Sequence, residues 1–152
     1  MIRATVTIKG TEALVAGLKR IPPAVRRRVE EVVKETAWLI HNDAKFMCPV
    51  DTGRLRSSIS VNWSDSGMEY GEVRGEVRVG KTGKEAKPLK KEDGVGQVPK
   101  ELYGFYAVVG TNVEYAPYVE DFSPYLWPAF AMNKGRFLDK LKSVLGNELE
   151  RK

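Results

Sequence analysis

The sequence predicts an α+β fold, in which two main helices pack on one face of a mainly antiparallel sheet of about four strands. In residues 23–46 and 128–149, apolar residues recur at three- and four-residue spacing, which is typical of helices with one buried face. In residues 2–8, 55–63 and 72–79, apolar and polar residues alternate, as they do in strands with one buried face. A short turn sequence joins the last two stretches, so they are expected to pair antiparallel.

The composition bounds the size and chemistry of the molecule. A chain of 152 residues with 42% hydrophobic content is long enough for one domain with a substantial core, and too short for two of ordinary size. The lone Cys48 excludes an internal disulfide and a cysteine-based zinc cluster, and neither a metal nor a cofactor is expected. No apolar run reaches the length of a signal peptide or a membrane span, so the chain is expected in the cytoplasm when it is made. The interspersed net charge of +5 tolerates a nucleic-acid or acidic partner, and an ordinary charged surface explains it as well.

The first part of the chain is expected to form a strand, a short helix and the first long helix. Gly10 ends the alternation of residues 2–8, and residues 11–19 can then form a short helix. Two prolines break that helix, and a proline suits the first turn of the long helix, which continues to about Phe46. The predicted buried face of the long helix consists of Val25, Val29, Val32 or Val33, Ala37, Ile40 and Ala44.

A corner is predicted where the long helix gives way to the sheet. Pro49 lacks a backbone N–H and restricts the residues before it, so the helix should end there. Asp51 and Thr52 have short side chains that accept hydrogen bonds from backbone N–H groups, and Gly53 can adopt a left-handed backbone conformation. Either a strand or one helical turn leading into a strand can follow, with Leu55 as its first buried residue.

The stretch between the predicted hairpin and the next strand, residues 80–102, is rich in lysine and poor in apolar residues. A connection of this length inside one domain is usually mobile or functional, so a flexible, exposed arm that orders on assembly is expected. A tolerated, solvated insertion is the alternative, because loop length lowers stability only weakly. The candidate contacts of this arm with a partner or with DNA are Lys81, Lys84, Lys87, Lys90 and Lys91.

The last part of the chain is predicted to hold a strand, a short turn and the closing helix. Residues 103–109 form the strand, and residues 115–121 form a compact turn or a single helical turn. Pro128 suits the first turn of the closing helix. The buried face of that helix is expected to contain Phe130, Phe137, Leu141, Leu145 and Leu149.

Aromatic residues are dense between residues 103 and 130, and they are interleaved with carboxylates. Core packing accounts for part of this density. Tyrosine and tryptophan also dominate protein–protein interfaces, whereas carboxylates disfavour nucleic acid, so a subunit interface is expected. Its candidate residues are Tyr115, Tyr118, Glu120, Tyr125 and Trp127.

Three motifs in this order resemble a known protein family. The first is Pro49-Val50-Asp51-Thr52-Gly53 followed by Leu55 and Ser58-Ile59, the second is the stretch of residues 113–120, and the third is Pro124-Tyr125-Leu126-Trp127-Pro128-Ala129. Together they resemble the signature of tailed-phage neck and minor tail proteins, the head–tail joining group related to tail completion protein Z of phage lambda. The chain departs from that pattern at residues 121–123, where members usually have Gly and Thr after the Glu.

The resemblance implies a structural virion protein rather than an enzyme. Such a protein would act in head–tail joining or tail completion, in the neck or tail end of the particle, after synthesis in the host cytoplasm. A ring of identical subunits is the expected form, because repeated head-to-tail contacts can close into rings. The implied partners are further copies of the chain, other phage neck and tail proteins, and DNA in the lumen.

Two functions of other classes compete with this reading. Asp51-Thr52-Gly53 matches the tripeptide of aspartic proteases, but Arg54 would keep Asp51 ionised, which opposes the proton sharing that those enzymes need. A small nucleic-acid-binding module would instead use the lysine-rich arm and the basic run of residues 26–28. His41 and Cys48 are seven residues apart on one predicted helix, about 10 Å along its axis, which is too far for a catalytic pair.

Overall fold

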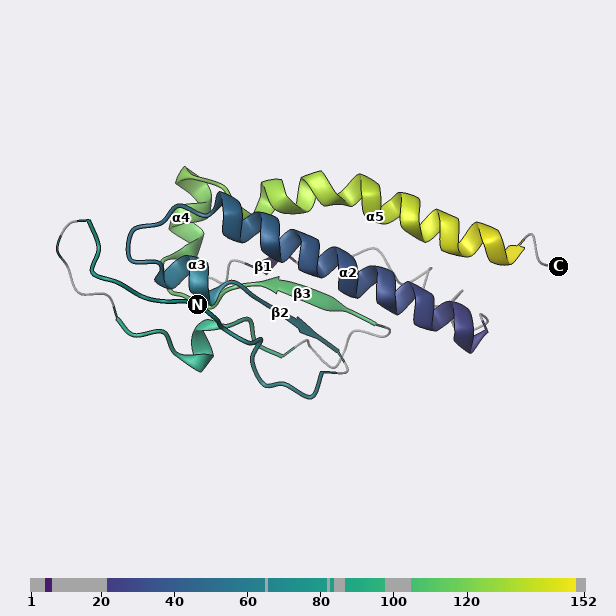
Figure 1. Cartoon of the computed structure of the whole chain (residues 1–152), viewed down its shortest axis with the longest axis horizontal. Helices are drawn as coiled ribbons and strands as arrows, with labels where there is room; N and C mark the ends of the chain where they lie inside the picture. Colours follow the sequence, from purple (N-terminus) through teal and green to yellow (C-terminus); the bar gives the residue numbers. More distant parts are fainter. Residues whose placement is uncertain are drawn as a thin grey trace.

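The computed structural model describes residues 5–6, 22–64, 66–81, 83, 87–97 and 105–149. In these residues the elements in chain order are β1 (Thr5–Val6), α2 (Pro23–Met47), α3 (Arg54–Ser58), β2 (Ser60–Trp63), the 3₁₀ turn η1 (Lys91–Asp93), β3 (Ala107–Gly110), α4 (Ala116–Phe122) and α5 (Leu126–Leu149). Figure 1 shows α2 and α5 side by side over one face of the sheet. The predicted α+β class is therefore confirmed. The short helix predicted for residues 11–19 lies outside the described residues.

The described strands form one antiparallel sheet in the order β1-β3-β2. The central strand β3 pairs Val109 with Val61 of β2 on one side and with Val6 of β1 on the other. The two edge strands, β1 and β2, are thus joined through β3, which comes later in the chain than either of them by more than 40 residues.

The prediction of a strand over residues 72–79, paired with β2, is wrong: residues 71–80 contain no strand. Gly71 lies so close to β2 that an added Cβ would stand 2.7 Å from the Val61 carbonyl oxygen, and its N–H donates to the Val95 carbonyl at 2.7 Å. Further along, the Arg78 N–H donates to the Thr52 carbonyl at 2.9 Å, at the corner. The segment therefore bonds to two loops instead of the β2 ladder, although its residues alternate as those of a strand do.

The corner takes the helical alternative. Residues 54–58 form α3, and the strand begins only at Ser60. Leu55, Ile59 and Val61 are all buried in the core, as the alternating pattern predicted, because one helical turn also returns Leu55 and Ile59 to the same side.

The core consists of two clusters. The larger cluster lies between α2, α5 and the sheet, and it includes Ile40, Ile59, Val109 and Tyr125. The smaller cluster joins only the two long helices, which extend past the end of the strands in Figure 1. It is made of Val25, Val29, Val32 and Leu141, with Phe137, Val144 and Leu145 packed against it.

The predicted buried faces of the two long helices agree with the structure, apart from Leu149, whose side chain is outside what the structure describes. On α2 the buried residues include Val25, Val29, Val32, Ala37, Ile40 and Ala44. On α5, Leu141 is buried, and Phe130, Phe137 and Leu145 are partly buried. None of the described helices is both long and apolar enough to cross a membrane.

Candidate functional site

The corner is held by backbone geometry and by hydrogen bonds to a distant segment. Gly53 has φ +82°, and an added Cβ would stand 2.9 Å from the Glu76 carbonyl oxygen, so both conformation and space require glycine here. The Thr52 hydroxyl accepts from the Arg54 N–H at 3.3 Å. The Asp51 carboxylate accepts from the Lys81 N–H at 2.8 Å. Asp51 and Thr52 thus fix the start of α3 and the end of the 71–81 segment together.

Arg54 is the centre of a buried ion-pair cluster that the sequence did not reveal. It is only 6% exposed. Its Nη2 and Nε donate to the two oxygens of Asp93 at 2.7 and 3.2 Å, in the two-pronged geometry that suits a guanidinium and a carboxylate. Its Nη1 donates to Glu114 Oε1 at 3.3 Å, and Lys87 Nζ donates to the same oxygen at 3.1 Å. The partners come from η1 and from the loop before α4, so proximity in the chain offered no signal for them.

The charges of this cluster depend on one another. Hydrogen bonding to Asp93, more than any other contact, raises the pKa of Arg54. A hydrogen bond from its own backbone N–H, followed by those from Lys87 and Arg54, lowers the pKa of Glu114 to about 2. Arg54 and Glu114 are consequently charged at neutral pH, and the cluster stabilises the packing of three distant segments rather than performing proton transfer.

A row of buried hydroxyls continues from the ion-pair cluster along the ends of β2 and β3. The hydroxyls of Ser58 and Thr111 lie 2.6 Å apart, and Thr111 Oγ1 donates to the Asp93 carbonyl at 3.2 Å. Ser60 Oγ accepts from the Val95 N–H at 2.8 Å. These bonds hold residues 93–95, all of them buried, against the sheet.

The lysine-rich stretch is consequently only partly an exposed arm. Residues 87–97 are described, and Asp93, Gly94 and Val95 are buried. Lys81, Lys87, Lys90 and Lys91 are exposed, whereas Lys84 lies outside the described residues. Of these four lysines, Lys87 makes a close ion pair, with Glu114 at 3.1 Å. The Nζ of Lys91 is farther from its nearest carboxylate, 4.0 Å from Glu69.

The candidate interface residues differ in their burial and in their contacts within the chain. Tyr125 is fully buried, so it belongs to the core and not to a surface. Glu120 is engaged inside the chain: its carboxylate accepts from the backbone N–H groups of Tyr125, Leu126 and Trp127 at 3.1, 3.0 and 2.8 Å. Those groups have no partner within α5, so Glu120 caps the N-terminus of that helix.

Among the other aromatic residues of this region, Tyr115 is partly buried against the larger cluster, whereas three side chains on α4 and at the start of α5 are exposed. Tyr118 is 63% exposed, Phe122 92% and Trp127 60%. Trp127 also packs on Phe130, with 5.6 Å between the ring centroids. We call Tyr118, Phe122 and Trp127 the aromatic surface. Phe122 was not among the predicted interface residues, although it follows Tyr118 by four positions, the spacing that places two residues on one helix face.

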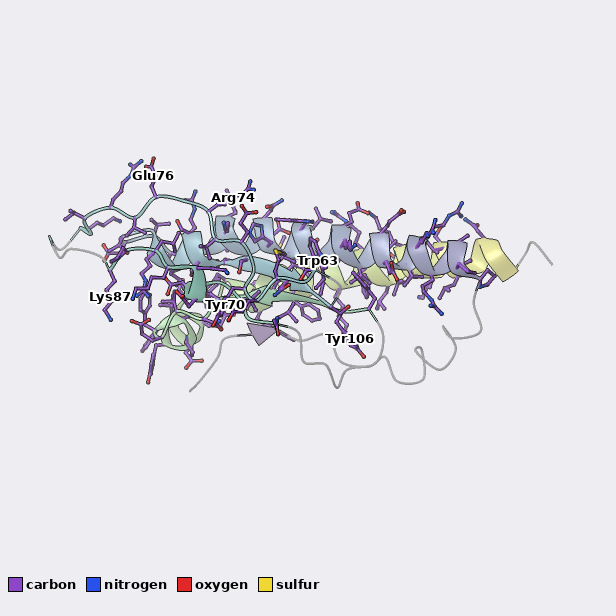
Figure 2. The ribbon with its side chains drawn as sticks, turned by 90° about the horizontal axis from the view of Figure 1, so that it is seen from below. Trp63, Tyr70, Arg74, Glu76, Lys87 and Tyr106 are labelled. Carbon is purple, nitrogen blue, oxygen red and sulfur yellow. The ribbon has the colours of Figure 1, made fainter. Side chains whose placement is uncertain are left out.

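A basic hollow of about 450 Å³ lies on the corner. Its lining includes four cationic side chains, Lys45, Arg56, Arg74 and Arg78, and two carboxylates, Asp51 and Glu76. Arg74 is paired with Glu72 at 2.9 Å, and Arg78 is paired with Glu76 at 2.7 Å. Figure 2 shows the segment that carries Arg74 and Glu76 along the upper side of the molecule.

The described residues offer no catalytic constellation. Asp51 binds a backbone N–H, and the buried His41 has its Nε2 3.1 Å from the Ile59 carbonyl oxygen. Burial raises the pKa of the Cys48 thiol to about 12, so the reactive thiolate is scarce at neutral pH. In the part of the chain that the structure describes, no three His, Cys, Asp or Glu side chains are grouped to hold a metal ion.

Comparison with known proteins identifies the family. A family model described as bacteriophage HK97 gp10, a tail component, matches residues 12–121. This range contains the corner, the ion-pair cluster and nearly all of α4. No curated protein and no solved structure matches the chain significantly. Because the match covers well over half of its length, the chain belongs to the HK97-gp10-like family of bacteriophage tail components.

Proposed function

We propose that the chain is a structural protein of the phage neck or tail end, that it assembles into a ring, and that it acts in head–tail joining or tail completion. Family membership supports a structural tail component. The observation that carries the proposal further is the aromatic surface, whose Phe122 is 92% exposed on a short helix. Large aromatic side chains left in water on an ordered surface mark a contact site, because burial of their apolar area then favours association.

The aromatic surface is held ready for contact. Glu120 on α4 caps α5, so the two helices that carry Tyr118, Phe122 and Trp127 are joined by three hydrogen bonds. Little conformational entropy remains to be lost when a partner binds, which favours affinity. Aromatic residues in such positions are the usual energetic centres of protein interfaces.

The partners proposed for this protein are further copies of itself, other phage neck and tail proteins, and DNA in the lumen of the assembled tube. The lysine-rich stretch, residues 80–102, would reach the neighbouring molecules, with Lys81, Lys90 and Lys91 exposed on the described part. The virion is the proposed location, after synthesis in the host cytoplasm. The role is one of binding and shape, with no chemical step.

Complementation of a phage that lacks this gene tests the proposal. The double substitution Tyr118→Ser and Phe122→Ser should leave the fold intact, since both residues are exposed, and should reduce infectious particles by several orders of magnitude. Electron microscopy should then show separate heads and tails. The control is Leu138→Ser, which removes an exposed apolar side chain from α5, outside the aromatic surface. Normal numbers of joined particles with the double variant would overturn the proposal.

Nucleic-acid binding remains a second candidate because of one specific observation. Arg26, Arg27 and Arg28 are all exposed on the first turns of α2. Contacts of arginine with phosphate would give a DNA affinity that falls steeply with salt. Replacement of the three arginines with glutamine should flatten that salt dependence, and absence of binding at low salt would eliminate this candidate.

A further inference from the structure

We propose that the aromatic surface of one copy docks into the basic hollow of the next copy, so that a ring is built from a single repeated head-to-tail contact. The inference rests on the ring assembly proposed above and specifies the two surfaces that make it. The three side chains of the aromatic surface are each at least 60% exposed, and the hollow is an open volume of about 450 Å³.

The two surfaces have opposite charge. Residues 113–133 contain no lysine or arginine, in a chain whose net charge is +5. Of their three carboxylates, Glu114 pairs with Arg54 and Lys87, and Glu120 caps α5, so Asp121 is the one that can meet a partner. Asp121 stands next to Phe122 on the exposed end of α4. Four cations and two carboxylates line the hollow, and because Arg74 and Arg78 are paired with Glu72 and Glu76, Lys45 and Arg56 are the lining cations that have no ion pair among the described residues. Opposite charge guides association and excludes wrong pairings, including the pairing of two acidic surfaces or two basic ones.

The cations of the hollow are crowded. Burial, followed by the charges of Arg56 and Arg74, lowers the pKa of Lys45. Arg56 is exposed, and no carboxylate of the described residues lies within ion-pair distance of it. A carboxylate brought in by a second molecule would therefore compensate Arg56, which no carboxylate of the described residues does.

The size and lining of the hollow also suit a protein side chain. A volume of about 450 Å³ falls within the range of about 300–1,000 Å³ that is typical of binding pockets. The lining includes the apolar Val50, and Phe46, which is 90% exposed, lies next to Lys45 in the chain. An aromatic ring can cover apolar surface at Val50 while its neighbouring carboxylate meets Arg56, whereas a DNA phosphate has no apolar surface to offer.

The positions of the two surfaces favour a head-to-tail contact. Both lie at the same end of the long molecule, where α4 and the chain after α2 are found in Figure 1. In Figure 2 they lie on opposite sides of that end: the segment with Arg74 and Glu76 is above, and the pale green α4, seen end-on, is below. A donor surface and an acceptor surface on opposite sides leave each copy free to bind two neighbours, which is the condition for a ring.

Disulfide trapping between two different single-cysteine additions tests this contact directly. Cys48 is buried, so it does not compete with cysteines placed on the surface. Phe122→Cys marks the aromatic surface, and Val50→Cys, at a position 44% exposed, marks the hollow. On mild oxidation of an equal mixture, the mixed disulfide should form at least about tenfold faster than either disulfide between like chains, because docking raises the effective concentration of the two thiols. Intact-mass spectrometry separates the three products.

Two controls make the result specific. Lys142→Cys places the thiol on an exposed position of α5 outside both surfaces, and its mixture with Phe122→Cys should show no such preference. Adding Arg56→Glu to the Val50→Cys protein should slow the mixed disulfide. Adding Asp121→Lys to the Phe122→Cys protein should then restore part of the rate, since the pair of charges has been exchanged.

The possible outcomes separate the rival occupants. A rate equal to that of the Lys142→Cys control overturns the proposal, and so does a dominant disulfide between two Phe122→Cys chains, which would mean a symmetric contact. Binding of a short DNA duplex that depends on Arg56, without the mixed disulfide, assigns the hollow to phosphate and also overturns it. If the mixed disulfide is absent while the Tyr118 and Phe122 double variant fails in complementation, only this docking is wrong. If the disulfide forms and that variant joins heads to tails normally, the proposed function is wrong.

Discussion

Arg54 is a buried cation whose carboxylate partners are supplied by distant parts of the chain. Asp93 lies 39 positions away and Glu114 lies 60 positions away, so the contacts of one side chain fix where η1 and the loop before α4 meet α3. Burial makes this arrangement sensitive to change, because an unpaired charge in a dry environment is far more costly than a missing apolar contact.

Removing Arg54 should therefore be strongly destabilising. Arg54→Met leaves the buried Asp93 carboxylate without a cationic partner, and it should lower the free energy of unfolding by about 3–5 kcal/mol. The double variant Arg54→Met and Asp93→Leu should lose clearly less, since no buried charge remains. Urea denaturation followed by circular dichroism measures both. Arg56→Met, at an exposed position, is the control, and an equal effect at both positions would contradict the role of Arg54.

Glu114 provides a pH-dependent part of the same cluster. Its pKa is lowered from 4.5 to about 2 in the folded protein, so the stabilisation that it contributes is fully present above pH 4.5 and is lost as the pH falls toward 2. The gain is small, up to about 1 kcal/mol, because the Glu114 side chain is 57% exposed. The difference in stability between wild type and Glu114→Gln should consequently disappear between pH 4.5 and 2. Thermal unfolding at several pH values checks this, with Glu92→Gln at an exposed position as the control. If wild type were still more stable than Glu114→Gln at pH 2, the ionised Glu114 carboxylate would not be the source of the stabilisation.

At the scale of the elements, the junction between α4 and α5 depends on one carboxylate. Glu120 accepts three backbone hydrogen bonds from the first turn of α5 and the residue before it. This is the work of a helix cap, performed by a residue from the preceding helix, and it explains how two helices separated by a short turn keep a fixed angle.

Loss of this cap should be measurable. Glu120→Ala should lower the free energy of unfolding by about 1–2 kcal/mol, and Glu120→Gln by roughly half as much, since glutamine keeps an acceptor but loses the favourable charge at the helix N-terminus. Asp139→Ala, on the exposed face of α5, should have little effect. Chemical denaturation gives all three values. If alanine and glutamine both matched wild type, the capping role would be refuted.

The sequence predicts the helices better than the sheet for a physical reason. The buried face of α2 follows from local spacing, and every one of its predicted positions is buried, with Val32 as the choice over Val33. The partner of β2 depends on contacts that span the chain: β2 pairs with β3, and residues 72–79 are held by the corner and by residues 93–96. Alternation of apolar and polar residues indicates an extended segment with one exposed side. It does not indicate which neighbouring segment forms hydrogen bonds with it.

The candidate site shows the same limit. Gly53 and Pro49 were identifiable because their effect on the backbone is local. The partners of Arg54 and the capping role of Glu120 were not, since both depend on side chains that meet only after folding. Tyr125 was taken for an interface residue because composition cannot distinguish a buried tyrosine from an exposed one, and its burial is set by the packing of α5 on the core.

At the scale of the whole molecule, the two long helices have unequal support. Near the corner they pack on the sheet through the larger cluster, whereas near the start of α2 the described residues join them through the small helix–helix cluster and the ion pair of Lys140 with Glu35. Stability should therefore be graded along the helix pair, because local opening is easiest where few apolar contacts are lost.

Native-state hydrogen exchange should reveal this gradient. Backbone amides of residues 27–33 should exchange through local opening at a lower free energy than those of residues 38–46. Leu141→Ala, which truncates the smaller cluster, should cost about 2–3 kcal/mol globally and should speed exchange of residues 27–33 most. Leu138→Ala, at an exposed position of the same helix, is the matched control. Uniform protection along α2 would contradict the graded picture.

The attachment of residues 93–95 has a mechanical consequence. These residues are tied to α3 by Arg54 and to the end of β3 by bonds from Thr111 and from the Asn112 N–H, which donates to the Asp93 carbonyl at 2.8 Å. A neighbouring molecule that pulled on the lysines just before them would load those few polar bonds in parallel, together with the packing of the buried Val95. Tension in an assembled tail would then be resisted at the same place where the first long helix turns into the sheet.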